Sequence, residues 1–326
     1  LTMGEVTQQF EAEFRALTGS KYAFAVSNAT VALHLACLAV GLGPGDEAIT
    51  PALTFVATSN AVLYTGATPR FADICSPHDL TLDPADVERR ITTATKAIVV
   101  MHYGGFACDM PAILDVAARH HLAVIEDAAH APGAFLDGKH LGAWGDVGCF
   151  SFFSNKNLST GEGGTIITNR GDLAEKIRLQ RSHGMTTLTY DRHQGHAYSY
   201  DVIDLGYNYR IDEIHSALGR AQLARLEENN ALRRAFTLRY WGNLKDSGLE
   251  LPFKPESPIP LPDANLTPSY PPSLKGRGKP SEARRGLGSQ PSHHLLPVLL
   301  PTGVDRKTII DALRARGIQT SIHYPP

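Results

Sequence analysis

The sequence lacks a long apolar run, a charge imbalance and a secretion signal. No run of about 18 consecutive apolar residues occurs, so we expect no membrane-spanning helix. Residues 1–10 have neither the basic region nor the apolar core of a signal peptide. The 31 Lys and Arg residues nearly balance the 33 Asp and Glu residues, which argues against binding to nucleic acid or to an anionic membrane. These absences favour a cytoplasmic protein that binds a small molecule.

Disulfide and metal-binding patterns are also missing. The four cysteines are widely spaced, form no CxxC pair and lie in apolar segments: Cys37, Cys75, Cys108 and Cys149. Reduced thiols pack well in such segments, so they indicate a reducing compartment. Two histidine pairs, at residues 120–121 and 293–294, have no cysteine or carboxylate partner at a metal-like spacing. We therefore expect no metal site, and solvated or structural roles for both pairs.

Residues 6–226 alternate short β-branched runs with longer amphipathic stretches, which is typical of βα units on a mostly parallel sheet. A chain of 326 residues with 43% hydrophobic content can bury the core of such a domain. The strand candidates are residues 23–27, 47–51, 68–73, 97–102, 122–127, 148–152 and 165–168. The helix candidates, with apolar residues every three or four positions, are residues 30–40, 55–64, 109–120 and 173–182. The pattern predicts an α/β fold for a large domain, residues 1–226.

The rest of the chain predicts a smaller α+β domain, residues 227–326. Residues 211–240 are rich in Ala, Leu, Arg and Glu, which favours one long helix connecting the two domains. Residues 255–291 are rich in proline, glycine and basic residues, so we expect an exposed, disordered insertion. The elements predicted after it are a strand at 292–300, a helix at 306–316 and a strand at 318–323. These elements are too few for a finished domain, so we expect it to be incomplete at its C-terminal end.

Lys156 lies in a glycine-containing stretch, residues 151–164, that reaches from one predicted strand to the next. A lysine amine attacks a carbonyl only after losing its proton, so an imine-forming lysine needs a sheltered site that lowers its pKa. Sequence position does not show such shelter, since a lysine beside glycines is a surface residue in most proteins. The segment alone leaves a catalytic lysine and a surface lysine as alternatives.

Asp127 ends an apolar predicted strand, residues 122–127. Ligands of open α/β sheets bind at the C-terminal ends of the parallel strands. An aspartate there can hold a pyridine nitrogen protonated, so that the ring acts as an electron sink. The alternative is a helix N-cap, which an aspartate at a strand-to-helix junction also satisfies.

A possible anion site lies at residues 27–30, where a predicted strand passes into a helix. Free N–H groups and the helix dipole at such a start form a cradle for phosphate, although an ordinary N-cap would have the same residues. A phosphate cradle, then Asp127, then Lys156 about 30 residues later fit one cofactor held by its phosphate, its ring nitrogen and its aldehyde.

Six ordered motifs strengthen this interpretation. They are residues 28–35 (NATVALHL), 54–58 (TFVAT), 126–130 (EDAAH), 151–156 with 161–164 (SFFSNK and GEGG), 206–210 (GYNYR) and 317–326 (GIQTSIHYPP). The series resembles that of the DegT/StrS family, which are fold-type I, pyridoxal phosphate (PLP) dependent aminotransferases acting on nucleotide-linked keto-sugars. The resemblance covers nearly all of the chain except the proline-rich segment.

The resemblance implies a set of cofactor-binding roles. Lys156 would form the Schiff base with PLP and shuttle a proton, while Asp127 would pair with the pyridine nitrogen. His130 would lie near the phenolic oxygen of the ring, and Phe55 near the segment that covers the ring face. The phosphate would be bound by Ala29, Thr30 and Ser151, and by Asn208 of a neighbouring subunit, which implies a homodimer with shared active sites. Three further residues fall at positions near the substrate: Tyr103, His183 and His323.

The implied reaction moves an amino group, by resemblance from glutamate, to a keto group of a nucleotide sugar, as in the biosynthesis of polysaccharide or antibiotic sugars. Two half-reactions at one site predict ping-pong kinetics. One alternative is a sugar dehydratase of the same fold, but those enzymes have histidine where this chain has Lys156. The other is a non-catalytic protein with this fold. The chain begins close to the motif at residues 4–11, so we expect the family's usual N-terminal helix and substrate loop to be absent.

Overall fold

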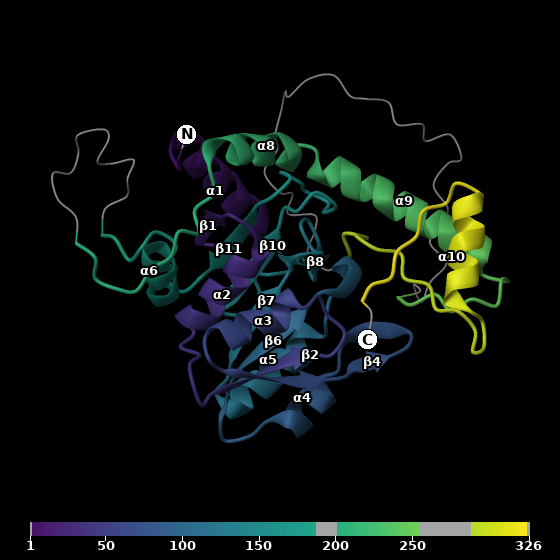
Figure 1. Ribbon diagram of the computed structural model, residues 1–326, viewed down its shortest axis with the longest axis horizontal. Helices are drawn as coiled ribbons and strands as arrows, with labels where there is room; N and C mark the ends of the chain where they lie inside the picture. Colours follow the sequence, from purple (N-terminus) through teal and green to yellow (C-terminus); the bar gives the residue numbers. More distant parts are fainter. Residues whose placement is uncertain (1, 187–200, 254–287, 325–326) are drawn as a thin grey trace.

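The computed structural model describes residues 2–186, 201–253 and 288–324, and its centre is a seven-stranded sheet (Figure 1). The strand order is β1 (Tyr22–Val26), β11 (Gly164–Thr168), β10 (Val147–Ser151), β7 (Ala123–Asp127), β6 (Thr95–Met101), β2 (Glu47–Pro51) and β3 (Thr68–Ala72). β11 is antiparallel to both of its neighbours, while the pairs from β10 to β3 are parallel. The predicted α/β class is confirmed, and every predicted strand of this sheet ends within two residues of the observed bounds.

Helices cover both faces of the sheet. On one face lie α2 (Ala29–Ala39), α3 (Ala57–Tyr64) and α6 (Gly171–Gln180), whose apolar residues form one cluster with alternate strand residues such as Ile125. On the other face lie α1 (Glu5–Thr18), α4 (Pro84–Arg90) and α5 (Met110–His120), which pack against the remaining strand residues such as Val124. Strands buried on both faces read as continuous apolar runs, which explains why they were predictable.

α1 was not among the predicted helices, and a distant residue fixes where it starts. Glu213 is the first residue of α8 (Glu213–Leu223). Its carboxylate accepts hydrogen bonds from the N–H groups of Gly4 at 2.8 Å, Val6 at 3.1 Å and Thr7 at 3.0 Å. A carboxylate at a helix N-terminus satisfies donors that have no intrahelical acceptor. This contact spans about 200 residues and leaves no local sequence signal.

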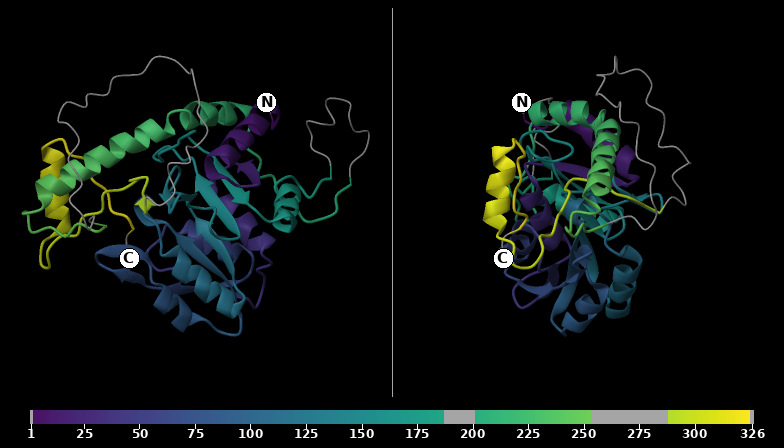
Figure 2. Two further views of the ribbon diagram at one scale, coloured as in Figure 1. Left: turned by 180° about the vertical axis from the view of Figure 1, so that it is seen from behind. Right: turned by 90° about the vertical axis from the view of Figure 1, so that its right-hand side faces the viewer.

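The predicted single helix at residues 211–240 is wrong, because the structure has two helices there. α8 ends at Leu223, and α9 (Leu226–Leu244) begins after a break at Arg225, where φ is -107° and ψ is -2°. Figure 2 shows α9 running away from the sheet, with α10 (Arg306–Ala315) near its far end. α10 confirms the helix predicted at residues 306–316.

The two strands predicted near the C-terminus are wrong. Residues 292–300 run without a ladder partner, apart from one isolated bridge between Leu299 and Glu250. Their backbone bonds instead to the loop after β6, since the N–H of Ser292 donates to Gly105 O at 3.2 Å and that of His294 to Gly104 O at 2.8 Å. Residues 318–323 are also non-regular. A strand needs a partner along its edge, which an apolar pattern does not supply.

Residues 255–287 of the predicted insertion lie outside the described residues, but its end is ordered. Ser289–Gln290 form β12, which pairs with β8 (Phe135–Leu136), and β8 pairs in turn with β9 (Lys139–His140). The other small elements are the antiparallel pair β4 (Ile74–Ser76) and β5 (Asp79–Leu82), and the 3-10 turn η1 (Tyr103–Gly105). The division into domains at residue 226 stays a prediction.

The four cysteines are free thiols, three buried and one exposed. Within the described ranges, no helix combines the length and the apolar character that crossing a membrane would require.

Candidate active site

The predicted site residues come from strand ends along one edge of the sheet. Asp127 is the last residue of β7, Ser151 the last of β10, and Tyr103 lies two residues after β6. The turn at residues 27–28 follows β1 in the same way. Because these strands run in the same direction, their C-terminal ends meet at the edge where α/β proteins bind ligands.

Asp127 is a buried carboxylate held by two donors. Its side chain accepts from Thr58 Oγ1 at 2.7 Å and from the N–H of Ala129 at 3.1 Å. Burial raises the pKa of Asp127, while the hydrogen bonds from Thr58 and Ala129 and the charge of Lys156 act against this rise. No helix follows β7 within residues 128–134. The alternative of a helix N-cap is therefore excluded for Asp127.

Lys156 lies in the loop between β10 and β11 and is partly buried. Burial lowers its pKa to about 8, and the nearby carboxylate of Asp127 opposes that shift. The two side chains are thus close enough to influence each other's ionisation. A lysine of this kind has a sizeable neutral fraction near neutral pH, which is what a nucleophilic amine requires.

The N-terminus of α2 follows β1 directly. The side chain of Asn28 is its N-cap and accepts from the N–H of Val31 at 3.0 Å. The N–H groups of Ala29 and Thr30 belong to the first turn, where a helix offers no acceptor of its own. Capping and anion binding are therefore compatible here, because different N–H groups serve each purpose.

Gly164 allows the turn at residues 27–28 to approach β10. It pairs with Val26 of β1 on one side and with Ser151 of β10 on the other. A Cβ at this position would lie 2.8 Å from the carbonyl carbon of Asn28, a distance that no side chain tolerates. Ser151 is buried, and its Oγ accepts from the N–H of Phe153 at 3.3 Å. The absence of a side chain at residue 164 thus brings the α2 N-terminus and Ser151 to the same corner.

His130 and His294 lie in ring contact beside Lys156, with their ring planes tilted by 36°. Their ring centroids are 4.3 Å apart, and both rings are buried. Burial, and after it the charge of the other imidazole and of Lys156, lowers the pKa of His130 well below its ordinary value. His130 Nδ1 accepts from the N–H of Gly104 at 3.3 Å, and its Nε2 lies 3.2 Å from Tyr324 Oη.

Tyr103 and His323 lie near the same cluster. The Tyr103 hydroxyl donates to His323 O at 2.9 Å, and burial raises the pKa of Tyr103 to about 12. Burial and the charge of Lys156 lower the pKa of His323. Phe55, two residues before α3, is 53% exposed, and its ring centroid lies 5.8 Å from that of Tyr324.

His183 and Asn208 lie on a separate, exposed part of the chain. Asn208 forms an isolated bridge with Ser182, and the N–H of His183 donates to Tyr207 O at 2.9 Å. Both side chains are exposed. The N–H of Ser27 donates to Tyr209 O at 2.9 Å, so this segment runs beside the turn before α2.

Two residues of the cluster were missed by the sequence interpretation. Thr58 lies inside a quoted motif, and its position one helical turn after Thr54 was a signal that could have been used. His294 was assigned a solvated or structural role together with His293. A solvated role is wrong for both, because their side chains are buried.

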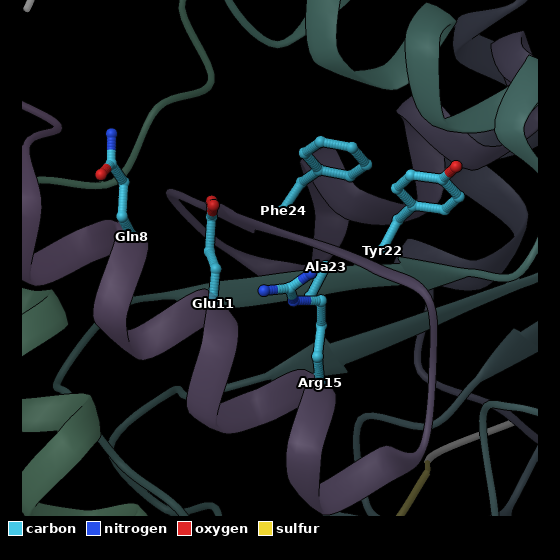
Figure 3. Close-up of a pocket in the computed structure, with 6 residues that line it drawn as sticks. All are labelled: Gln8, Glu11, Arg15, Tyr22, Ala23 and Phe24. Atoms are coloured by element: carbon cyan, nitrogen blue, oxygen red, sulfur yellow. The ribbon is translucent and has the colours of Figure 1, made fainter.

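A separate hollow of about 290 Å³ lies between α1 and β1, away from these residues (Figure 3). Its lining consists of Gln8, Glu11, Arg15, Tyr22, Ala23 and Phe24. β1 is an edge strand, and Glu11 accepts from the N–H of Ala25 at 2.8 Å and from Arg181 Nη1 at 2.5 Å. Glu11 of the lining therefore accepts a hydrogen bond from a backbone N–H on the open edge of the sheet. The lining contains none of the predicted site residues.

Comparison with known proteins identifies the family. The profile of the DegT/DnrJ/EryC1/StrS aminotransferase family matches residues 1–326. Spore coat polysaccharide biosynthesis protein SpsC of Bacillus subtilis is 45% identical over 241 residues, which are 74% of this chain and 62% of SpsC. GDP-perosamine synthase of Caulobacter vibrioides is 47% identical over 232 residues, or 71% of this chain and 60% of that protein. The chain thus spans about three fifths of the length of these relatives.

A solved structure supports the same assignment. DesV of S. venezuelae, determined in complex with a ketimine intermediate, is 33% identical and superimposes with a TM-score of 0.82. The match covers 100% of this chain and 76% of DesV. With its mostly parallel sheet flanked by helices, this chain has the fold-type I architecture and belongs to the DegT/DnrJ/EryC1/StrS aminotransferase family.

Proposed function

We propose that this chain is a PLP-dependent aminotransferase that transfers an amino group, from glutamate, to a keto group of a nucleotide-linked sugar. The proposal is carried by one observation: a buried carboxylate, Asp127, and a partly buried amine of lowered pKa, Lys156, lie near each other at the C-terminal edge of the sheet. The names of the related GDP-perosamine synthase and spore coat polysaccharide protein support a sugar substrate.

The residues present fit PLP at each end of the cofactor. The N–H groups of Ala29 and Thr30, with Ser151, would bind the phosphate at the positive end of α2. Asp127 would hold the protonated ring nitrogen, and Thr58 would orient Asp127 through its hydroxyl. When bound, PLP supplies an electron sink for the charge left on a carbon that loses a proton.

Lys156 would provide both covalent attachment and proton transfer. Its burial keeps part of the amine population neutral, so the nitrogen can accept a proton from one carbon and return it to another. His130 would hydrogen-bond to the phenolic oxygen of the ring, and Phe55 would lie near its covered face. Neutral histidines around Lys156 add no positive charge to the site, which favours the cationic form of the bound ring.

A homodimer would complete the site. Asn208, exposed on a segment beside the α2 N-terminus, would reach the phosphate bound by a neighbouring subunit. Tyr103 and His323 would line the substrate pocket from the same chain, and His183 would contribute to it from its exposed turn. Each of these three side chains carries a hydrogen-bonding group that can bind sugar hydroxyls or the amino donor.

The central test is Lys156→Ala. We expect the variant to lose the visible absorbance of bound cofactor and all amino transfer, because no other amine replaces that of Lys156. Borohydride reduction of the parent protein should attach PLP to the peptide containing Lys156, as read by mass spectrometry. Lys21→Ala, at an exposed position, is the matched control and should behave like the parent. Cofactor on a different lysine would disprove the assignment.

The reaction itself is tested by product analysis. PLP-loaded protein would be incubated with glutamate and a panel of nucleotide keto-sugars, and the products weighed by mass spectrometry. A gain of an amino group in place of the keto oxygen is the expected result. Cofactor binding without amino transfer to any sugar of the panel would favour a non-catalytic protein, and loss of a sugar hydroxyl would favour a dehydratase.

A further inference from the structure

His294 is buried at the proposed site and belongs to a segment far from it in sequence. Its N–H donates to Gly104 O at 2.8 Å, which holds residues 292–294 against the loop after β6. Its ring contacts that of His130 in a tilted arrangement, and the residue is 8% exposed. The charges of Lys156 and His323 both act on the pKa of His294, so these side chains lie near one another.

The neighbouring amides fix which nitrogen of His294 carries the hydrogen. Asn157 Nδ2 donates to Ser292 O and to Asn230 Oδ1, both at 2.8 Å. Asn230 is oriented in turn, because its Nδ2 donates to Pro132 O at 2.9 Å and a carbonyl oxygen can only accept. Asn157 Oδ1 therefore faces His294 Nδ1, at 2.9 Å, as an acceptor. It follows that His294 Nδ1 carries the hydrogen and that Nε2 presents a lone pair.

This lone pair has no partner within the part of the chain that the structure describes. Nε2 of His294 is buried and makes no hydrogen bond there. Burial, followed by the charge of Lys156, lowers the pKa of His294 well below its ordinary value, so the ring stays neutral. A buried acceptor without a donor is unfavourable, which is why nearly all such atoms in folded proteins are paired.

In His130 the hydrogen lies on the other ring nitrogen, so its Nε2 is a donor. Its Nδ1 accepts from the N–H of Gly104, so its hydrogen lies on Nε2 and is donated toward Tyr324 Oη. The two neighbouring imidazoles thus offer one donor and one acceptor close to each other. A ligand group that satisfies His294 must bring an N–H or an O–H.

We propose that His294 is a substrate-binding residue whose Nε2 accepts a hydrogen bond from an N–H or O–H group of the bound substrate. This inference rests on the proposed aminotransferase function and adds a residue to it. The donor is either the ammonium group of the amino acid or a hydroxyl of the sugar. Asn157 and Asn230 are positioning residues in this scheme, since they fix the orientation and the tautomer of the imidazole.

Two substitutions separate the role of Nε2, which has no partner among the described residues, from that of Nδ1, which bonds to Asn157. His294→Gln places an amide near the position of Nε2 and gives up the bond to Asn157, whereas His294→Asn keeps a group near Nδ1 and removes the one near Nε2. The two half-reactions would be measured separately, with glutamate and with the keto-sugar. We expect His294→Asn to raise the KM of one half-reaction about tenfold, the effect of losing one hydrogen bond. His294→Gln should stay within about threefold of the parent.

The affected half-reaction identifies the donor. A change with glutamate alone assigns the ammonium group, and a change with the sugar alone assigns a hydroxyl. Equal effects of the two substitutions would show a purely structural role, and no effect of either would show no role; both outcomes overturn the proposal.

A second measurement needs no catalysis and so separates this proposal from the proposed function. In the chain without added ligand, ¹⁵N spectra of labelled histidine report the tautomer and charge of His294, assigned by comparison with His294→Asn. We expect a neutral ring with hydrogen on Nδ1 at pH 6.5, the ordinary histidine pKa, and loss of the single tautomer in Asn157→Leu. A hydrogen on Nε2, or a charged ring, would overturn the inference even if the enzyme transfers amino groups.

Discussion

At Asp127, burial and hydrogen bonding act in opposite directions on one carboxyl group. Burial raises its pKa, and the bond from Thr58 at 2.7 Å is the largest influence against that rise. We expect Thr58→Val, which keeps the shape but removes the donor, to weaken PLP binding by at least about tenfold, because a hydrogen bond to a charged group contributes about 1.5–3 kcal/mol. Equilibrium titration of the cofactor measures this. Thr58→Ser retains a hydroxyl and should bind like the parent; equal losses in both variants would assign the effect to packing.

The pKa of Lys156 predicts the pH dependence of cofactor capture. The ordinary lysine value of 10.5 is lowered to about 8, first by burial and against the pull of Asp127. Since only the neutral amine reacts, the capture rate should rise with pH and level off above about 8. Asp127→Asn removes the opposing charge, so its midpoint should move to lower pH. Stopped-flow absorbance across pH measures both, and a midpoint near 10.5 would contradict the burial of the amine.

Individual site residues could be predicted where they stand at a recognisable position in the local sequence pattern. Asp127 ends an apolar run, and Lys156 lies between two strand patterns, so both could be nominated from the sequence. His294 could not, because its partner Asn157 is 137 residues away in the chain. Nothing near residues 293–294 in the sequence indicates a neighbour across that distance.

At the scale of elements, Glu126 joins the ends of two strands to a loop. It is fully buried on β7, lies 2.9 Å from His102 Nε2 after β6, and accepts from the N–H groups of Gly142 and Gly145 at 2.6 Å each. We expect Glu126→Gln to lower the free energy of unfolding by roughly 3 kcal/mol, since an amide nitrogen would then face a backbone donor in a buried network. Denaturant titration measures this. Glu88→Gln, at an exposed ion pair with Arg119, should change stability far less, and equal effects would contradict the argument.

The prediction of helices and strands was accurate for the buried sheet. It was poor for segments whose structure depends on contacts with residues distant in the sequence. The strands of the sheet lie between two helix layers, so side chains on both faces are apolar. Such a strand is visible in the sequence as a continuous apolar run. Residues 292–300 have a similar apolar pattern, yet their N–H groups bond to the loop at Gly104 and Gly105. The start of α1 depends on Glu213, which also comes from distant sequence. Such features cannot be predicted without knowing which distant residues pack against the segment.

At the scale of the whole molecule, we propose that a second chain completes the cofactor site. Asn208 is exposed, and its segment runs beside the α2 N-terminus through the bond between Ser27 and Tyr209. The family fold could be predicted from ordered motifs, whereas the contribution of a second chain is a proposal that follows from the resemblance. Asn208→Asp should weaken PLP binding, because the new carboxylate would repel the phosphate.

Mixing Lys156→Ala with Asn208→Asp tests whether the sites are shared, at a PLP concentration too low to load the Asn208→Asp sites. Under this condition each variant alone has a defect in both sites of its homodimer. If Asn208 acts on the neighbouring subunit's site, each mixed dimer has one site with both changes and one with neither. Random exchange in an equal mixture should then restore about one quarter of the parental sites, since half of the dimers are mixed. Amino transfer after subunit exchange measures the recovery. If Asn208 acted within its own chain, every site in a mixed dimer would carry one defect, and activity would not return.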